Sequence, residues 1–503
     1  MVLMPCISWL SSGLLLEVIL DQLDFSAKDF DEFINQYTRT NALAAISPVK
    51  SPQTHTPTLD DVITYVSHVD RSGKADVRIT DAVNHHAVPA DYHPTEYPTE
   101  AETRKFGSPK IGTKGGVVNY NFDKASHYTE TEKAAFRVAL ADWSNVANIQ
   151  FKETAALQGK GITFIRPVDK NAHPGNTHWS TIGNADIAGD GSIASTITHA
   201  EITIKDKAVG PIDTSNHYAI GVIAHEIGHA IGLSHSGKYN GTVDGMTAQN
   251  GPYDSHQWSI MSYLNADDPK ARYYGDPAMS ERNAWTPYTP MIADVAAVQR
   301  LYGKPVGGAL TGGQTFGFNS NVKGPESDVL DFKINHDPRV TIYDSGIDNT
   351  VDLSGYTHGA KIDLTPGTFI SASPKGTMID NIGIAFGTKI DHVVGTQGND
   401  TIIKNVDLKT VMKGGGGNDT FESTLKGFDG STIADLNIGD KIHFTDAAPS
   451  SFHFADLGKL LTFGDKSSSY HLAMTNDPSG RFTQTADKFG GVDLTLAAAS
   501  QFA

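Results

Sequence analysis

The stretch "AHEIGHAIGLSHSG", Ala224 to Gly237, places three histidines and one glutamate within eleven residues. The chain has only 20 His among 503 residues, so chance is a poor explanation of this cluster. The preceding "DTSNHYAIGVIA" offers Thr, Ser and Asn as N-caps before an unbroken apolar run. This pattern predicts a helix that ends at Gly232 and carries the first two histidines of the cluster.

The spacing of the cluster fits a catalytic zinc site. On a helix, residues four apart share a face, so His225 and His229 can direct their imidazoles to one point, with Glu226 beside it. Gly232 can adopt a φ angle closed to other residues and turn the chain, so that His235 supplies a third nitrogen. Three neutral imidazoles leave one position of a Zn²⁺ ion open for water, as in catalytic sites.

Glu226 suits the role of general base in such a site. Water bound to zinc has its pKa lowered to about 7, so Glu226 can take its proton and return it to a leaving amine. The predicted reaction is therefore peptide hydrolysis. The alternatives are surface histidines that serve solubility and a closed structural zinc site, but a closed site needs a fourth strong protein ligand and has no use for Glu226.

Charge and composition exclude several classes of protein. The formal charge of −17 argues against a nucleic-acid partner, while surplus carboxylates suit calcium binding or solubility. The single cysteine, Cys6, cannot form an internal disulfide. The first twenty residues are apolar, but no Lys or Arg precedes Lys28 and Glu17 interrupts the run. We therefore expect a packed N-terminal helix there, and neither a signal peptide nor a stable membrane anchor.

The chain divides into three predicted regions. Residues 1–105 form a pro-region and linker, because the Pro-rich polar stretch at 85–100 is typical of an exposed, cleavable connector. Residues 106–303 form an α+β catalytic domain with a twisted sheet and an active-site helix. Residues 304–503 form an all-β domain, since apolar residues there come in short runs between Gly, Asp, Asn and Thr.

Four segments support the α+β assignment of the catalytic domain. The stretches 115–122 and 162–205 contain short β-branched runs typical of strands. The stretch 129–151 has apolar residues at helical spacing after a Thr/Glu-rich start, and 290–303 predicts a closing helix. Within the strand region, we expect "HAEITIK", residues 199–205, to be the edge strand that pairs with an extended substrate.

A methionine-containing turn follows the histidine cluster. "SIMSY" spans Ser259 to Tyr263, and the elongated zinc motif with such a turn resembles the metzincin clan of metalloendopeptidases. The resemblance implies that Met261 forms a hydrophobic floor beneath the zinc ligands. It also implies that Tyr263 is an additional, displaceable zinc ligand and oxyanion stabiliser, as in serralysins and astacins.

Three further stretches resemble serralysins in the right order: "MIADVAAVQRLYG", "TFGFNSN" and "VDLSGYT". They are similar to the segments that lead from the serralysin catalytic domain into its β-roll, and the resemblance covers roughly Gly115 to Asp446. Two positions depart from the pattern. Ser236 stands where serralysins usually have Pro and is more typical of matrixins, and Ile347 stands in a glycine position of a calcium-binding pattern.

Two glycine-aspartate repeats predict a parallel β-roll. Their pattern is the calcium-binding nonapeptide Gly-Gly-x-Gly-x-Asp-x-apolar of RTX proteins, in which Phe421 would point inward. The matching residues are Gly395, Gly398 and Asp400 in "GTQGNDTII", and Gly414, Gly415, Gly417 and Asp419 in "GGGGNDTFE". The two aspartates are 19 residues apart, about one turn of the roll, so we expect one calcium ion between the two loops. The intervening 404–413 has lost its glycines and should form the opposite side without a good site.

Together these features predict a secreted, monomeric zinc endopeptidase that is made as a zymogen and cleaves proteins or peptides. The serralysin resemblance implies export by a type I ABC transporter, although the ending "VDLTLAAASQFA" meets the expected export pattern loosely. Two alternatives remain: a calcium-dependent surface or adhesin module with an inert protease-like domain, and a matrixin-like peptidase joined to an unrelated β domain. Glu226 argues against the inert module, which would not need both the base and three ligands.

Overall fold

The computed structural model divides the chain into two units at residue 57, and the description below concerns the second, Pro57–Ala503. The residues described are 58–69, 71, 104–158, 160–166, 175–182 (backbone only), 195–237, 253–264, 286–466, 468–477, 480–488 and 490–498. The predictions for the first twenty residues, for Cys6 and for the linker at 85–100 lie outside the described residues. Among the helices in the described ranges, none is long and apolar enough to cross a membrane.

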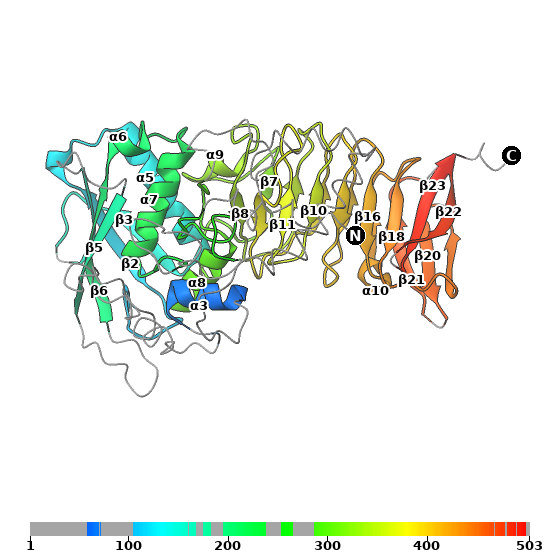
Figure 1. Ribbon diagram of the computed structural model, residues 1–503, viewed down its shortest axis with the longest axis horizontal. Coiled ribbons are helices and arrows are strands. Elements are labelled where there is room, and N and C mark those ends of the chain that lie inside the picture. Colours follow the sequence, from blue (N-terminus) through cyan, green and yellow to red (C-terminus); the bar gives the residue numbers. More distant parts are fainter. Residues whose placement is uncertain are drawn as a thin grey trace, which may run out of the picture. The chain divides into compact units, whose positions relative to one another are not determined.

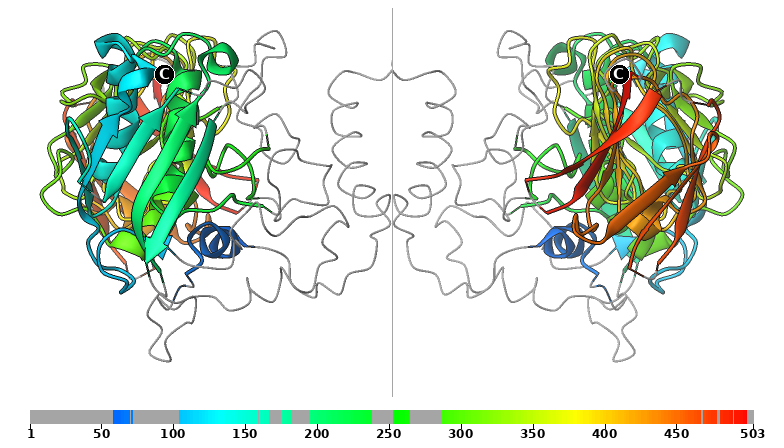
Figure 2. Two further views of the ribbon diagram at one scale, coloured as in Figure 1. Left: turned by 90° about the vertical axis from the view of Figure 1, so that its left-hand side faces the viewer. Right: turned by 90° about the vertical axis from the view of Figure 1, so that its right-hand side faces the viewer.

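The first part of this unit is built on a six-stranded sheet (Figure 2). Five strands follow the order β1-β6-β4-β2-β3, and the sixth strand, β5, pairs with β6. The strands are β1 (Arg104–Lys105), β2 (Gly116–Phe122), β3 (Ile149–Glu153), β4 (Gly161–Ile165), β5 (Gly175–Ile182) and β6 (Ser195–Ile204). All pairs are parallel except β5 with β6.

The prediction that residues 199–205 form an edge strand is wrong. Residues 199–203 of β6 pair with β4 on one side, and the same strand pairs with β5 on the other. The reason is that β5 folds back antiparallel onto β6, a long-range pairing that no local pattern announces. Among the described strands, β5 pairs with β6 alone.

Three longer helices accompany this sheet, as expected: α5 (Glu130–Val146), α7 (His217–Ala230) and α8 (Ile292–Tyr302) (Figure 1). Helix α5 begins with a capping box, in which Thr129 and Glu132 bond each other's backbone N–H. Asn216 caps α7 by accepting a hydrogen bond from the N–H of Ala219. Short helices are η2 (Lys124–Ser126), α6 (Asp206–Val209), α9 (Ser327–Leu330) and α10 (Leu425–Phe428).

The second part confirms the predicted β-roll. Consecutive strands from β13 to β18 alternate between an eight-stranded and a nine-stranded sheet. Figure 1 shows the short strands of the roll, such as β10, β16 and β18, side by side. Parallel pairing with an offset of 19 residues places Ile402 opposite Phe421, and both side chains are fully buried between the sheets. The strands are β7 (Thr315–Gly317), β8 (Val340–Ile342), β9 (Thr350–Asp352), β10 (Lys361–Asp363), β11 (Phe369–Ser371), β12 (Ile382–Ile384), β13 (His392–Val394), β14 (Thr401–Ile403), β15 (Val411–Lys413), β16 (Thr420–Ser423), β17 (Ser431–Ile433) and β18 (Lys441–Phe444).

Antiparallel strands close the far end of the roll. They are β19 (Phe452–Asp456), β20 (Leu460–Asp465), β21 (Tyr470–Met474), β22 (Gly480–Ala486) and β23 (Val492–Ala498). Strand β23 pairs with β18, and the β19–β20–β21 meander joins the other sheet at β17. Both sheets therefore continue past their last regular turn, which covers edges that would otherwise be exposed.

Helix α3 (Leu59–Ser67) comes from the region predicted to be a pro-segment, yet it belongs to the same compact unit as the sheet. Thr58 and Asp61 form its capping box. Its apolar face, with Val62, Ile63 and Val66, is buried in the core shared with α7 and α8. The removal of residues 1–105 stays a prediction, and the position of α3 bears on where such a segment would end.

Candidate metal centre

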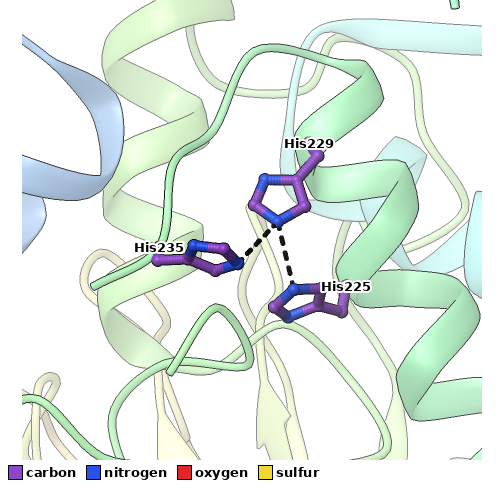
Figure 3. Close-up of side chains that lie close together, drawn as sticks. All are labelled: His225, His229 and His235. Atoms are coloured by element: carbon purple, nitrogen blue, oxygen red, sulfur yellow. Dashed lines mark hydrogen bonds between the residues drawn. The ribbon is translucent and has the colours of Figure 1, made fainter. Parts of the chain in front are cut away.

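The structure brings the three predicted histidines together. His225 and His229 lie one turn apart on α7, and His235 follows the turn at Gly232, whose φ of 104° is the left-handed conformation expected there. The Nε2 atom of His229 lies 3.1 Å from Nε2 of His225 and 3.0 Å from Nε2 of His235 (Figure 3). In a tetrahedral zinc site, nitrogen ligands lie roughly 3.3 Å apart. The three nitrogens therefore fit around one zinc ion.

Backbone carbonyls orient two of these imidazoles. His225 Nδ1–H donates to the carbonyl of Ile260 and His229 Nδ1–H donates to that of Leu233, each at 2.8 Å. With these protons on Nδ1, the Nε2 lone pairs point at one another, an arrangement that a cation stabilises. Burial lowers the pKa of His225 to about 4 and that of His229 to about 3. Both rings are thus held neutral, the form that binds a metal.

The two remaining residues predicted at this site are Glu226, which is adjacent to His225 in α7, and Tyr263. Glu226 is only 7% exposed. The ring of Tyr263 is centred 4.4 Å from the ring of His235 and 5.9 Å from that of His225. The phenol of Tyr263 therefore lies beside two of the imidazoles, and the catalytic roles of Glu226 and Tyr263 stay predictions.

Met261 packs directly under α7. It is fully buried, and a Cβ atom added to Gly228, which lies between the two helical ligands, would come within 2.6 Å of its sulfur. The small residue in the histidine motif is thus required by the approach of the methionine. This contact agrees with the hydrophobic floor that the metzincin resemblance implies.

A buried aspartate that the sequence analysis missed anchors the methionine turn. Asp294, in the first turn of α8, accepts hydrogen bonds from Ser259 Oγ (2.6 Å), Ile260 N (2.6 Å) and Met291 N (2.8 Å). Burial raises its pKa to about 7, although these donors favour the carboxylate. Because Ile260 also orients His225, Asp294 connects α8 to the metal centre. The sequence signal that could have revealed Asp294 was its position in the first turn of α8, where an acidic residue caps the helix.

A second missed residue, Asp254, joins the turn to the loop of His235. Its Oδ1 accepts hydrogen bonds from Ser236 Oγ (2.6 Å) and Ser262 Oγ (2.9 Å), and all three residues are buried. Ser236 is the position at which the chain departs from the serralysin pattern, so its hydroxyl has a structural role here. No local pattern connects Asp254 with Ser236, because 17 residues separate them.

In the roll, the two predicted calcium loops stack on each other. The N–H of Asp400 donates to Asp419 Oδ1 at 2.8 Å, and a Cβ on Gly395 would come within 2.3 Å of the Gly414 carbonyl. Gly415 and Gly417 adopt φ of 99° and 101°, which only glycine does easily. Gly398 lies as close to the loop on the other side, with the N–H of Gly359 2.3 Å from a Cβ built on it.

A third loop, residues 435–440, extends this stack and was not predicted. Asp419 N–H donates to Asp440 Oδ1 at 2.9 Å, and Asp435 accepts from the N–H groups of Gly414 and Gly415. Burial, together with repulsion from Asp400, Asp440 and Asp435, raises the pKa of Asp419 to about 7. The sequence analysis missed this loop because "DLNIGD" retains a single glycine, Gly439, of the repeat pattern.

The opposite side of the turn holds a lysine. As predicted, 404–413 leads into the other sheet, where β15 pairs with β13. The Lys404 side chain is 1% exposed, and its ammonium donates to the carbonyls of Asn405 (2.7 Å) and Leu408. A protein cation therefore satisfies carbonyls inside this turn, which agrees with the loss of the calcium-binding glycines.

Comparisons with known proteins cover both parts of the chain. A family model described as Matrixin matches residues 113–250, and one described as Peptidase M10 serralysin C terminal matches residues 309–466. Metallopeptidase AprA of Pseudomonas marginalis is 31% identical over 283 residues, 56% of this chain and 55% of the relative. Serralysin B of Dickeya chrysanthemi is 30% identical (55% and 54% covered), and its Serralysin C is 33% identical (53% and 52%).

The chain spans about half the length of the curated relatives it matches. The match at residues 309–466 overturns the alternative of a matrixin-like domain joined to an unrelated β domain. A metzincin catalytic domain precedes a serralysin C-terminal domain, in the order that the histidine site and the β-roll occupy in the structure. The matches of residues 113–250 and 309–466, with the similarity to AprA and the serralysins, support a serralysin-type metzincin metalloprotease.

Proposed function

We propose that this protein is a zinc-dependent endopeptidase that hydrolyses peptide bonds in proteins. The observation that carries the proposal is the convergence of three imidazoles, two of which are kept neutral by burial and held in the metal-binding tautomer by backbone carbonyls. A buried carboxyl group, Glu226, lies directly beside the first of them. An inert surface module would have no use for this combination.

His225, His229 and His235 would hold the zinc ion, with Tyr263 as a displaceable fourth side chain. Zinc in this position supplies a Lewis acid that polarises the scissile carbonyl and lowers the pKa of a water molecule. Glu226 takes a proton from the attacking water and transfers it to the leaving amine. The low exposure of Glu226 strengthens its interactions with these groups, since little water screens them. The hydroxyl of Tyr263 donates a hydrogen bond to the developing oxyanion.

The β-roll domain would bind calcium and serve export. The stacked loops around Asp400 and Asp419 support one calcium ion between them, with glycine carbonyls and aspartate carboxylates as candidate ligands. The match to a serralysin C-terminal domain supports secretion, and a type I ABC exporter is the machinery that the family resemblance implies. We propose that the secreted protein acts as a monomer, after loss of an N-terminal pro-segment.

Casein digestion tests the proposed activity. The purified protein should degrade casein, lose that activity on treatment with a zinc-selective chelator in calcium-containing buffer, and regain it when zinc is returned. Calcium in the buffer keeps the roll folded while zinc is removed. Intact casein from a zinc-loaded, folded protein would overturn the peptidase and support the alternative of a calcium-dependent surface module.

A further inference from the structure

Helix α3 and the residues that follow it contact the loop that carries the third predicted zinc ligand. The N–H of Ser234 donates to the carbonyl of Val66 at 2.9 Å. The hydroxyl of Ser234 forms a short hydrogen bond with Nε2 of His68, whose side chain is buried at 4% exposure. Ser234 therefore forms two hydrogen bonds with a segment that lies some 170 positions earlier in the chain.

Ser234 occupies a critical place between two ligand groups. The residue before it, Leu233, offers the carbonyl that orients His229, and the residue after it is His235 itself. Displacement of Ser234 would therefore move both the carbonyl partner of one imidazole and the backbone of the other. The ring nitrogens of these two histidines lie only 3.0 Å apart, so a shift of a few tenths of an ångström would alter the metal site.

Helix α3 is itself firmly anchored. Arg300 on α8 donates to Thr64 Oγ1 and to the carbonyl of Val69, both at 2.8 Å, and forms an ion pair with Asp60. The His68 backbone adopts a left-handed φ of 56°, which ends the helix and turns the imidazole toward Ser234. The residues that bond to Ser234 are thus themselves held in place by α8.

Two further contacts hold the start of this loop. Tyr302 Oη donates to the carbonyl of Ile231 at 2.7 Å, and Gly232 approaches the carbonyl of Arg104 so closely that a Cβ would lie within 1.9 Å of it. The α3 contacts act beyond the turn, next to the ligand. They complement the Ser236 to Asp254 bond on the far side of His235.

We propose that His68 is a positioning residue for the zinc site, acting through Ser234 on His229 and His235. It follows that residues 58–69 are part of the functional enzyme, and that any segment removed on activation ends before Thr58. This inference rests on the proposed zinc site. It concerns how tightly the site holds its metal, which can be measured separately from the presence of metal and from peptidase activity.

The test compares His68→Ala, His68→Gln and Ser234→Ala in the full chain. We measure the rate of zinc release to a chromophoric chelator and the visible spectrum of the cobalt-substituted protein. His68→Ala and Ser234→Ala should each release zinc about tenfold faster and shift the cobalt bands, because loss of outer partners weakens metal sites by about 10- to 100-fold. The double variant His68→Ala/Ser234→Ala should release zinc no faster than either single variant. His68→Gln should release zinc slowly, because its amide can replace the hydrogen bond to Ser234.

Thr64→Ala is the matched control. It removes the hydrogen bond from Arg300 to Thr64 but leaves α3 anchored through the bond of Arg300 to Val69 and its ion pair with Asp60, and it does not touch Ser234. It should lower the thermal midpoint while zinc release and the cobalt spectrum stay as in the unmodified protein.

Several outcomes would overturn the proposal. Unchanged release and spectra in folded His68→Ala and Ser234→Ala, or equal effects in Thr64→Ala, would reduce α3 to general packing. An active secreted form whose N-terminus lies beyond Val69 would do the same. If His68→Ala does not fold, Ser234→Ala decides the matter alone, since it keeps the backbone bond to Val66. A chain that takes up neither zinc nor cobalt would instead contradict the proposed function.

Discussion

At the scale of single residues, the metal centre depends on ligands that the sequence predicts and on backbone partners that it does not predict. The ligands follow from the periodicity of a helix, because His225 and His229 must share a face. The orientation of the two imidazoles could not be predicted from the sequence. It is set by the backbone carbonyls of Ile260 and Leu233, and a residue of any type has such a carbonyl. A mutation cannot remove these carbonyls, so the fold of the chain sets the tautomers.

Glu226→Ala should separate metal binding from catalysis. The variant keeps all three imidazoles and should bind zinc normally, but kcat should fall by about three orders of magnitude or more because the general base is lost. Tyr263→Phe should cost less, about ten- to a hundredfold, since it removes one oxyanion donor and leaves the base. Zinc content and casein turnover of both variants check this. Normal digestion by Glu226→Ala would refute the mechanism.

At the scale of helices and strands, the sequence predicted the helices well, because capping residues and apolar periodicity act within one segment of the chain. The capping residues Thr129 and Asn216 and the apolar periodicity located α5 and α7 closely. Strand β5 lies within the predicted strand region, but its pairing with β6 was missed, because registers between distant strands depend on tertiary contacts. The third loop of the roll was missed for a related reason: Asp435 and Asp440 contribute through stacking on Gly414 and Asp419, without the glycine pattern.

The stacked loops predict how calcium affects stability. Asp400 accepts hydrogen bonds from the N–H groups of Thr396 and Ala360, so Asp400→Ala should cost some stability even without calcium. Its larger effect should appear with calcium, where a candidate ligand is also lost. Thermal unfolding with calcium and with a chelator measures the difference, and calcium titration measures affinity. Equal losses under both conditions, with unchanged affinity, would refute the proposed ion between the loops.

At the scale of the whole second unit, two buried carboxyl groups meet where the catalytic part joins the roll. Asp142 of α5 is 4% exposed and Glu326, before α9, is 2% exposed. Asn145 donates to Glu326 Oε1 at 2.7 Å, while Asp142 Oδ2 and Glu326 Oε2 have no hydrogen-bond partner among the described residues. Burial, with their mutual repulsion as the second cause for Asp142, raises the pKa of both groups. Folding therefore increases the affinity of these two carboxyl groups for protons.

This junction predicts a pH dependence of stability. Because the folded pKa values are raised, the stabilisation is complete below the unfolded value of about 4 and is lost as pH rises through the folded values. Asp142→Asn, which needs no proton, should flatten the dependence and raise the thermal midpoint at pH 8 by about 2 °C. Glu326→Gln should act in the same direction, and the two effects should not add. Thermal melts across pH at constant calcium test this, and an unaltered slope in both variants would show that the groups stay ionised.

The central claim is that His225, His229 and His235 hold one zinc ion. Metal analysis of the purified chain and of His229→Ala tests it most directly, because Nε2 of His229 lies within 3.1 Å of both other ring nitrogens. We predict one mole of zinc per mole of the unmodified chain and a loss of nearly all of it in a folded His229→Ala variant. Full zinc content in that variant would contradict the assignment.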